Sequence, residues 1–223
     1  MSGITVHRIG REAQPLVIID NFAPYPDVLR AAAIAAEFGP ALHHYPGIRA
    51  PLPTSYMPTQ QPVIAEVLTD VFGQPGPIDL IDASYSMVTS DPAALSIHQR
   101  LPHCDAFAVE RIALIHYLSE GDGTAFFRHR STGFETVDQS RAPIYLGQLD
   151  AELRYGSEPP RAYVAGDTPL FERTLLAEAR FNRALIYRSY VLHSGAITPD
   201  AKLSPDPATG RLTVTAFLSV EKI

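Results

Sequence analysis

The stretch RIALIHYLSEGDGTAFFRHR, residues 111–130, decides the fold class of this 223-residue chain. Residues 111–118 are rich in branched and aromatic side chains, and residues 124–130 include adjacent phenylalanines, as is typical of buried strands. Between them, Glu120-Gly121-Asp122-Gly123 has the residue types that tight turns require. The stretch therefore predicts a strand–turn–strand unit within a β-rich fold.

The remainder of the chain predicts helices first and strands afterwards. Apolar residues at helical spacing predict helices over residues 27–38 and 60–72, and each is followed by a glycine. Residues 139–168 predict a short helix with loops. Runs of branched and aromatic residues predict further strands, at residues 16–19, 78–88, 95–99, 174–181, 183–190 and 211–221. This order favours an α+β, mainly β fold whose core is a sandwich or barrel.

Chain length and composition indicate one ordinary globular domain, residues 1–223. We expect a helical N-terminal part, residues 1–77, to support a strand-rich core, residues 78–223. The net charge is −6, and no run of lysine or arginine offers a surface to nucleic acid or to a membrane. A single cysteine, Cys104, excludes an intrachain disulfide and fits a reducing compartment. With no apolar leader or membrane-length apolar run, we expect a cytoplasmic protein.

A candidate metal site is formed by His103 and Asp105 together with the distant His193. Alternate residues of an extended chain project from one face, so His103 and Asp105 point together and Cys104 points away. Two histidines and one carboxylate can hold a non-haem Fe(II) and leave positions open for a co-substrate and dioxygen. A surface loop with a separate core histidine is the alternative interpretation. The order of the flanking strands favours the metal-site interpretation over this alternative.

Arg211 follows Gly210 at the start of the last predicted strand. A guanidinium binds a carboxylate through two parallel charge-assisted hydrogen bonds, which suits the far end of a dicarboxylic oxo-acid. A strand-edge arginine in solvent is the alternative. The position of Arg211 after His193 in the chain favours a role in binding the oxo-acid carboxylate.

Residues 81–223 resemble the Fe(II)/2-oxoglutarate-dependent dioxygenases, in particular the prolyl 4-hydroxylase-like branch. The features that carry the resemblance occur in the order of that branch: Tyr85, His103-Cys104-Asp105, Tyr117-Leu118-Ser119, Gly121-Asp122-Gly123-Thr124-Ala125-Phe126, Asn182-Arg183-Ala184-Leu185-Ile186-Tyr187, His193 and Gly210-Arg211. Segments 45–51 and 127–130 are similar to those of a poorly characterised bacterial group.

The resemblance implies a double-stranded β-helix, or jelly-roll, core with the N-terminal helices packed on it. It implies Fe(II) held by His103, Asp105 and His193, with 2-oxoglutarate as co-substrate and dioxygen as oxidant. Oxidative decarboxylation of 2-oxoglutarate would then be coupled to hydroxylation, or a related oxidation, of a substrate. The glycine-rich turn departs from the strict family pattern, and we expect residues 40–58 and 131–168 to shape the substrate pocket.

Four further residues are weaker candidates for this site. Tyr85 could bind the co-substrate carboxylate, although a core tyrosine is about as good an interpretation. Arg49, Arg128 and Arg130 could receive an acidic substrate, against a structural or solvated role for each. His116 lies in an apolar strand and is expected to be a hydrogen-bonded core histidine.

Two other functional classes remain open. A metal-binding jelly roll without turnover, such as a sensor or scaffold, would not need Arg211. A zinc hydrolase could use the same three metal ligands, but no general base is evident. The substrate is expected to be a small molecule or a peptide, and a homodimer is possible.

Overall fold

The computed structural model describes residues 3–41, 45–201 and 203–220. The helices are α1 (Pro26–Ile34), α2 (Tyr56–Asp70) and α3 (Ala142–Tyr155), with short 3-10 turns at Pro92–Ala94 and Ile97–Arg100. The strands are β1 (Gly3–Ile9), β2 (Gln14–Asp20), β3 (Gly39–Pro40), β4 (Gly47–Pro51), β5 (Ile78–Val88), β6 (Ile112–Tyr117), β7 (Gly121–His129), β8 (Phe171–Ala179), β9 (Arg183–Arg188), β10 (His193–Gly195) and β11 (Leu212–Val220). The predicted predominance of β structure is confirmed.

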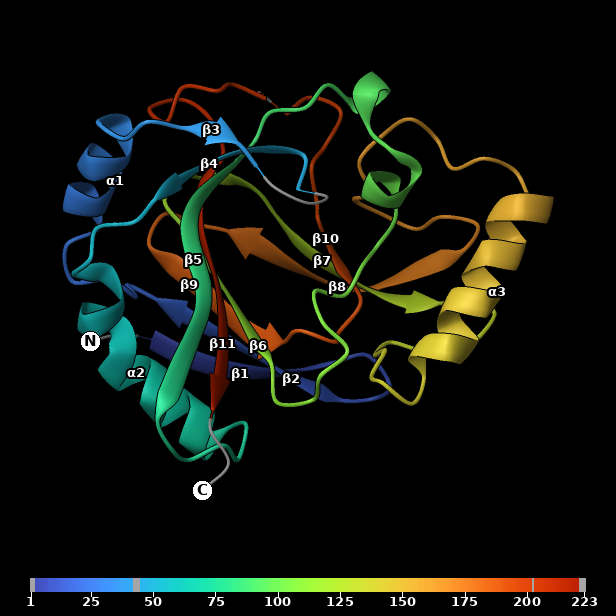
Figure 1. Cartoon of the computed structure of the whole chain (residues 1–223), viewed down its shortest axis with the longest axis horizontal. Coiled ribbons are helices and arrows are strands. Elements are labelled where there is room, and N and C mark those ends of the chain that lie inside the picture. Colours follow the sequence, from blue (N-terminus) through green and yellow to red (C-terminus); the bar gives the residue numbers. More distant parts are fainter. Residues whose placement is uncertain (1–2, 42–44, 202, 221–223) are drawn as a thin grey trace.

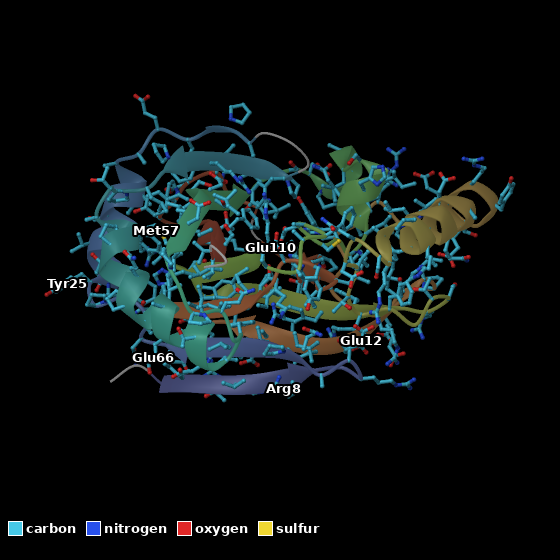
Figure 2. The ribbon with its side chains drawn as sticks, turned by 60° about the horizontal axis from the view of Figure 1, so that its bottom comes forward. Arg8, Glu12, Tyr25, Met57, Glu66 and Glu110 are labelled. Atoms are coloured by element: carbon cyan, nitrogen blue, oxygen red, sulfur yellow. The ribbon has the colours of Figure 1, made fainter. Side chains whose placement is uncertain are left out.

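Two antiparallel sheets organise these strands (Figure 1). The larger sheet has the order β1-β2-β9-β6-β11-β5-β4-β3, and the smaller has the order β10-β7-β8. The edge strand β1, which carries Arg8, runs along the outside of the molecule (Figure 2). The residues before position 78 thus supply four strands as well as two helices.

The outer face of the larger sheet packs against α1 and α2. Cross-strand register places one row of side chains on this face: Ala50, Tyr85, Val214, His116, Ala184 and Ile19. All of them except His116 belong to a buried cluster that includes Ala33 of α1 and Ile64 and Leu68 of α2. Burial of this apolar face is what holds the helices on the sheet.

The inner face of the larger sheet faces the smaller sheet. Tyr117, Leu185 and Tyr187 pack there against Phe126 and Ala177 of the smaller sheet. The next cross-strand row on this face is polar: Arg49, Ser86, Thr213, Tyr117 and Arg183. Several of these groups are hydrogen-bonded within the chain, as burial of a polar group requires: Ser86 bonds to Thr215, Thr213 to the carbonyl of Ser86, Tyr117 to Thr124 and Arg183 to Asp20.

The smaller sheet is covered on its far side by α3. Phe127, Val137 and Phe171 form a buried cluster with Tyr145 and Leu149 of α3. Cys104 packs against the same cluster, and burial raises the pKa of its thiol to about 12. The expected packing role of Cys104 is therefore confirmed.

One predicted strand is wrong and several strands were missed. Residues 95–99 were expected to be extended, but Ile97–Arg100 is a 3-10 turn. Gln99 accepts hydrogen bonds from the backbone and hydroxyl of Ser96, and this capping box favours the turn. The missed strands β1, β3, β4 and β10 are short or exposed, so they lack a buried apolar pattern. No helix in the described ranges is long and apolar enough to cross a membrane.

Candidate metal centre

The structure brings His103, Asp105 and His193 together. His103 and His193 form an isolated bridge, with reciprocal backbone hydrogen bonds of 2.9 and 2.8 Å. The backbone N–H of Asp105 donates to the carbonyl of Ser189 at 2.8 Å, which turns its carboxylate toward the two rings. One ligand atom from each of the three residues lies within 4.8 Å of the others.

His193 is held with one ring nitrogen directed at Asp105. Its Nδ1 lies 2.9 Å from the carbonyl of Val191, which can only accept, so Nδ1 carries the hydrogen. Its Nε2 lies 3.5 Å from a carboxylate oxygen of Asp105. Burial lowers the pKa of His193 to about 4, so the ring is neutral at pH 7 and Nε2 has a free lone pair. A carbonyl partner on the other nitrogen is typical of metal-bound histidines.

Asp105 and His103 complete the set. The Asp105 side chain is 17% exposed, and burial raises its pKa to about 6, opposed by the positive groups of His103 and Arg49. Nε2 of His103 lies 3.8 Å from the other Asp105 oxygen, and this ring is 54% exposed. A bound cation would compensate the buried carboxylate and leave one side open, so these residues fit a metal ion.

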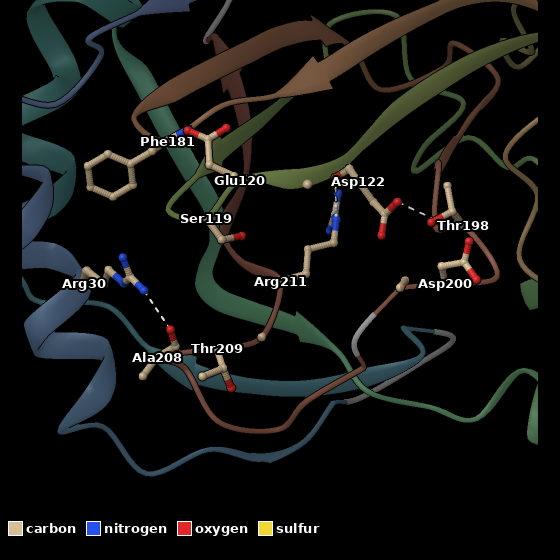
Figure 3. Close-up of a pocket in the computed structure, with 13 residues that line it drawn as sticks. Arg30, Ser119, Glu120, Asp122, Phe181, Thr198, Asp200, Ala208, Thr209 and Arg211 are labelled. Carbon is tan, nitrogen blue, oxygen red and sulfur yellow. Dashed lines mark hydrogen bonds between the residues drawn. The ribbon is translucent and has the colours of Figure 1, made fainter.

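Arg211 points into the molecule from the residue before β11. Its Nε donates to the carbonyl of Asp122 at 2.8 Å (Figure 3), and its Nη2 donates to the carbonyl of Gly123 at 3.1 Å. The guanidinium also lies 5.6 Å from the ring centre of Tyr117. Arg211 lines a pocket of about 530 Å³ with Arg30 and residues 119–122, among others. Two backbone carbonyls therefore fix the plane of this arginine at the start of β7.

Three site residues were missed by the sequence analysis: Tyr45, Ser86 and Thr213. The Tyr45 hydroxyl is buried. Burial raises the pKa of Tyr45, while the charges of Arg211 and Arg49 and the side chains of Ser86 and Thr213 oppose the rise. This phenol thus lies near both arginines and two hydroxyl side chains. Thr213 could have been found, because it follows Arg211 by two residues in a strand and shares its face.

Tyr85 is not brought to this group. It lies on the outer face of the larger sheet, where its hydroxyl donates to the carbonyl of Leu29 in α1 at 2.8 Å. Burial raises the pKa of Tyr85 to about 12. Strand alternation explains the placement, because the neighbours that face inward from β5 are Ser84 and Ser86.

Arg49, by contrast, lies on the inner face of the larger sheet. It pairs with Ser86 across β4 and β5, and its positive charge opposes the rise in the pKa of Asp105. Its Nη1 lies 3.3 Å from Asp82, and its guanidinium lies 4.7 Å from the ring centre of Tyr45.

Arg128 and Arg130 are occupied by carboxylates of the chain itself. Arg128 contacts Glu172 and lies 3.3 Å from the buried Glu135. Arg130 lies 3.3 Å from Asp167 and 3.8 Å from Glu172. The structure assigns these two arginines to an ion-pair network and does not place them beside the three candidate ligands.

His116 is the core histidine that the sequence predicted. Its Nδ1 lies 3.1 Å from the hydroxyl of Tyr56, and its Nε2 lies 3.0 Å from the side-chain oxygen of Asn182. Both ring nitrogens are thus satisfied on the outer face of the sheet.

Comparisons with known proteins give a family and two distant structural likenesses. The profile of a family of unknown function (DUF6445) matches residues 2–218. No curated protein matches the chain. The structure is similar to an N-substituted L-amino acid dioxygenase from Burkholderia ambifaria AMMD, with 11% identity, coverage of 98% of this chain and 96% of that one, and a TM-score of 0.48. The same enzyme in complex with alpha-ketoglutarate gives 11% identity, the same coverage and a TM-score of 0.42.

Proposed function

The chain belongs to the DUF6445 family of unknown function, and for it we propose the activity of a non-haem Fe(II)/2-oxoglutarate-dependent oxygenase. The observation that carries the proposal is the convergence of His103, Asp105 and His193, with a neutral Nε2 of His193 directed at the carboxylate. A solvent-facing carboxylate or a core histidine would not need this arrangement. The order of motifs along the chain supports the prolyl 4-hydroxylase-like branch.

We propose that the two facing sheets form the jelly-roll core of this superfamily, within one domain. The larger sheet and the smaller sheet enclose Phe126 and Tyr187, and the ring centre of Tyr187 lies 5.0 Å from that of His193. The metal ligands would thus sit at one end of the space between the sheets, beside a wall of aromatic side chains. Such a wall keeps water from the reacting groups.

The chain's own residues would divide the work of binding and orientation. His103, Asp105 and His193 would hold the iron, which when bound supplies the redox chemistry that couples 2-oxoglutarate and dioxygen to substrate oxidation. Arg211 would bind the far carboxylate of 2-oxoglutarate, since its plane is already fixed by the carbonyls of Asp122 and Gly123.

The inner hydroxyls would complete the carboxylate site. The buried Tyr45 hydroxyl lies near Arg211, Ser86 and Thr213, so it would donate to the same carboxylate. Thr213 donates to the backbone carbonyl of Ser86 at 3.0 Å, which holds its hydroxyl in this row. The co-substrate would meet one charged donor and at least one neutral donor in a buried site. A small molecule or a peptide would be the substrate.

Calorimetry with Fe(II) under anaerobic conditions tests the metal site. His103→Ala and Asp105→Ala are expected to abolish measurable Fe(II) binding, whereas His7→Ala, which changes an exposed histidine on β1, is expected to leave it unchanged. Intact Fe(II) affinity in either ligand variant would contradict the proposal. Zn(II) bound without any affinity for 2-oxoglutarate would favour a hydrolase or a scaffold instead.

A further inference from the structure

We propose that Thr132 is a nucleophile that accepts acyl groups from small esters, with His129 as its general base and Glu152 as the residue that positions His129. None of the three belongs to the candidate metal centre, and the reaction needs no metal ion. This activity would be additional to the oxygenase function proposed above and independent of it.

The three residues come from two elements that pack together. His129 is the last residue of β7, Thr132 lies in the turn that follows this strand, and Glu152 belongs to α3. Helix α3 covers the smaller sheet on this side (Figure 1). The backbone N–H of His129 donates to the carbonyl of Phe134, and that of Gly133 donates to the carbonyl of His129, each at 2.8 Å. These bonds fold the turn back beside the end of β7.

The hydrogen bonds run in one direction, from the hydroxyl to the carboxylate. Nε2 of His129 lies 2.8 Å from a carboxylate oxygen of Glu152, and Nδ1 lies 3.0 Å from Oγ1 of Thr132. Burial opposes ionisation of Glu152, but hydrogen bonds from Ser131, Gln148 and the imidazole lower its pKa overall. The ionised carboxylate can only accept, so Nε2 carries the hydrogen. In the neutral imidazole Nδ1 then has the lone pair, which accepts from the Thr132 hydroxyl.

The oxygen of Thr132 is held in place by the backbone. Its Oγ1 accepts from the N–H of Phe134 at 3.3 Å, so the hydroxyl hydrogen is left for the imidazole. Thr168 offers a comparison within the chain, because its Oγ1 accepts from the N–H of Phe171 at 2.9 Å in the same way. Both threonines are partly exposed, but only Thr132 has a histidine beside its hydroxyl in the part of the chain that the structure describes. Thr132 is therefore the one of the two that has a base.

The base is dry, whereas the hydroxyl can be reached from solvent. His129 is fully buried, and its ring centre lies 5.2 Å from that of Tyr145 and 5.0 Å from that of Phe171. Hydrogen bonds are electrostatically stronger in such low-dielectric surroundings than in water. A carboxylate, an imidazole and a hydroxyl linked in this order are the groups that activate a hydroxyl nucleophile, and they are recognised by geometry and role rather than by sequence position.

The acyl transfer balances without an oxidant or a cofactor. Oγ1 of Thr132 attacks the ester carbonyl while its hydrogen passes to Nδ1 of His129, and the Nε2 hydrogen stays bonded to Glu152. The backbone N–H of Thr132 has no acceptor in the described ranges, so it can donate to the carbonyl oxygen as this becomes negative. The bond from the carbonyl carbon to the leaving oxygen then breaks, and the alcohol leaves with the proton from Nδ1. The product is an acyl ester of Thr132, which water can hydrolyse.

Reaction with p-nitrophenyl acetate tests the assignment on the full chain, kept free of metal by a chelator. Release of p-nitrophenol is followed by absorption, and samples quenched early with acid are examined by tandem mass spectrometry of the tryptic peptide 131–141. We expect acetyl on Thr132 and a release rate about 100-fold lower in Thr132→Val, because general-base catalysis is worth about 100-fold or more. Thr132→Ser keeps the hydroxyl and should keep the reaction.

The matched control is Thr168→Val, which removes a hydroxyl with the same kind of backbone partner and should keep the wild-type rate. His129→Gln should lower the rate to that of Thr132→Val. Glu152→Gln should lower the maximal rate and leave KM for the ester unchanged, because Glu152 acts through the imidazole and not on the substrate.

The proposal is overturned if acid quenching finds no acetyl on Thr132, or if Thr132→Val releases p-nitrophenol at the wild-type rate. Urea unfolding is measured on every variant. If His129→Gln is unfolded, the pair Thr132→Val and Thr132→Ser decides, since both change a side chain at the surface. A protein that binds neither Fe(II) nor 2-oxoglutarate would contradict the oxygenase function and leave this test unaffected.

Discussion

Two buried histidines, His116 and His193, lie in the same fold but in different polar surroundings. Burial lowers the pKa of each to about 4. His116, on the helix-covered face, has a side-chain partner for both ring nitrogens. His193, on the inner side, has a partner for Nδ1 and turns Nε2 toward Asp105. Equal burial therefore comes with different surroundings, and the partner of the second ring nitrogen is what distinguishes His193 from His116.

Two tyrosines repeat the contrast. The Tyr85 hydroxyl donates to the carbonyl of Leu29 on the outer face. The Tyr45 hydroxyl is buried on the inner side, near Arg211 and the hydroxyl side chains of Ser86 and Thr213. The outer hydroxyl is thus bound to a helix backbone, whereas the inner one lies among polar side chains.

The largest expected effect separates the two histidines by metal binding. His193→Ala is expected to lower Fe(II) affinity by at least about 100-fold, because even partners of metal ligands are worth about 10–100-fold. His116→Ala should leave Fe(II) affinity unchanged and lower the free energy of unfolding. Anaerobic calorimetry and urea unfolding measure the two properties. Equal loss of Fe(II) affinity in both variants would contradict the assignment of metal binding to His193 and of a structural role to His116.

The pH dependence of stability sharpens the role of His116. Its folded pKa, lowered by burial from 6.5 to about 4, lies below its unfolded pKa, so the unfolded state takes up the proton first. Stability is therefore lost as pH falls from about 6.5 to 4. At 1.36 kcal/mol per unit, the loss is about 3 kcal/mol.

His116→Gln removes this titration and keeps a polar side chain for Tyr56 and Asn182. The difference in unfolding free energy between wild type and His116→Gln should therefore change by about 3 kcal/mol between pH 7 and pH 4. Urea unfolding at a series of pH values provides the measurement. Parallel curves for the two proteins would mean that His116 does not titrate as described.

Arg211→Ala tests the inner region at its co-substrate end. We expect 2-oxoglutarate affinity to fall about 10–100-fold, since hydrogen bonds to charged groups are worth about 1.5–3 kcal/mol. Fe(II) affinity should be unchanged, because Arg211 is bonded to Asp122 and Gly123 and not to the metal ligands. Calorimetry with Mn(II) present measures both. An unchanged affinity for 2-oxoglutarate would contradict the proposal that Arg211 binds the co-substrate.

The smallest expected effect distinguishes the two tyrosines. Tyr45→Phe should weaken 2-oxoglutarate binding about fivefold to tenfold, because the site loses a neutral donor near Arg211. Tyr85→Phe should lower the free energy of unfolding by about 1 kcal/mol and spare 2-oxoglutarate binding, because it loses only the bond to Leu29. Weaker 2-oxoglutarate binding in Tyr85→Phe, with unchanged binding in Tyr45→Phe, would show that Tyr85 is the tyrosine that contacts the co-substrate.

Periodicity predicted the long, half-buried elements well. The helix predicted over residues 60–72 corresponds to α2, whose residues Ile64, Val67 and Leu68 are buried, and the strand predicted over residues 78–88 corresponds to β5. The edge strand β1 was not predicted, since six of its seven residues are exposed and no apolar alternation marks it. Tertiary pairing with β2 makes it a strand.

Linear order selected the three candidate metal ligands, which the structure brings together, but it did not select Tyr45. His103, Asp105 and His193 could be selected because their spacing and sequence context constrain one another. Tyr45 could not, since its position depends on how residues 45–51 fold onto the inner face of the sheet. Tyr85 was preferred because it lies in a recognisable strand, but its side chain alternates to the wrong face.

The most direct test of the inner region is an anaerobic titration of the Fe(II)-loaded protein with 2-oxoglutarate, monitored by visible absorption. A weak charge-transfer band, characteristic of an oxo-acid chelated to Fe(II), is expected in wild type, with the titration midpoint shifted to higher concentration in Arg211→Ala. A wild-type protein that binds Fe(II) and develops no band on addition of 2-oxoglutarate would contradict the account.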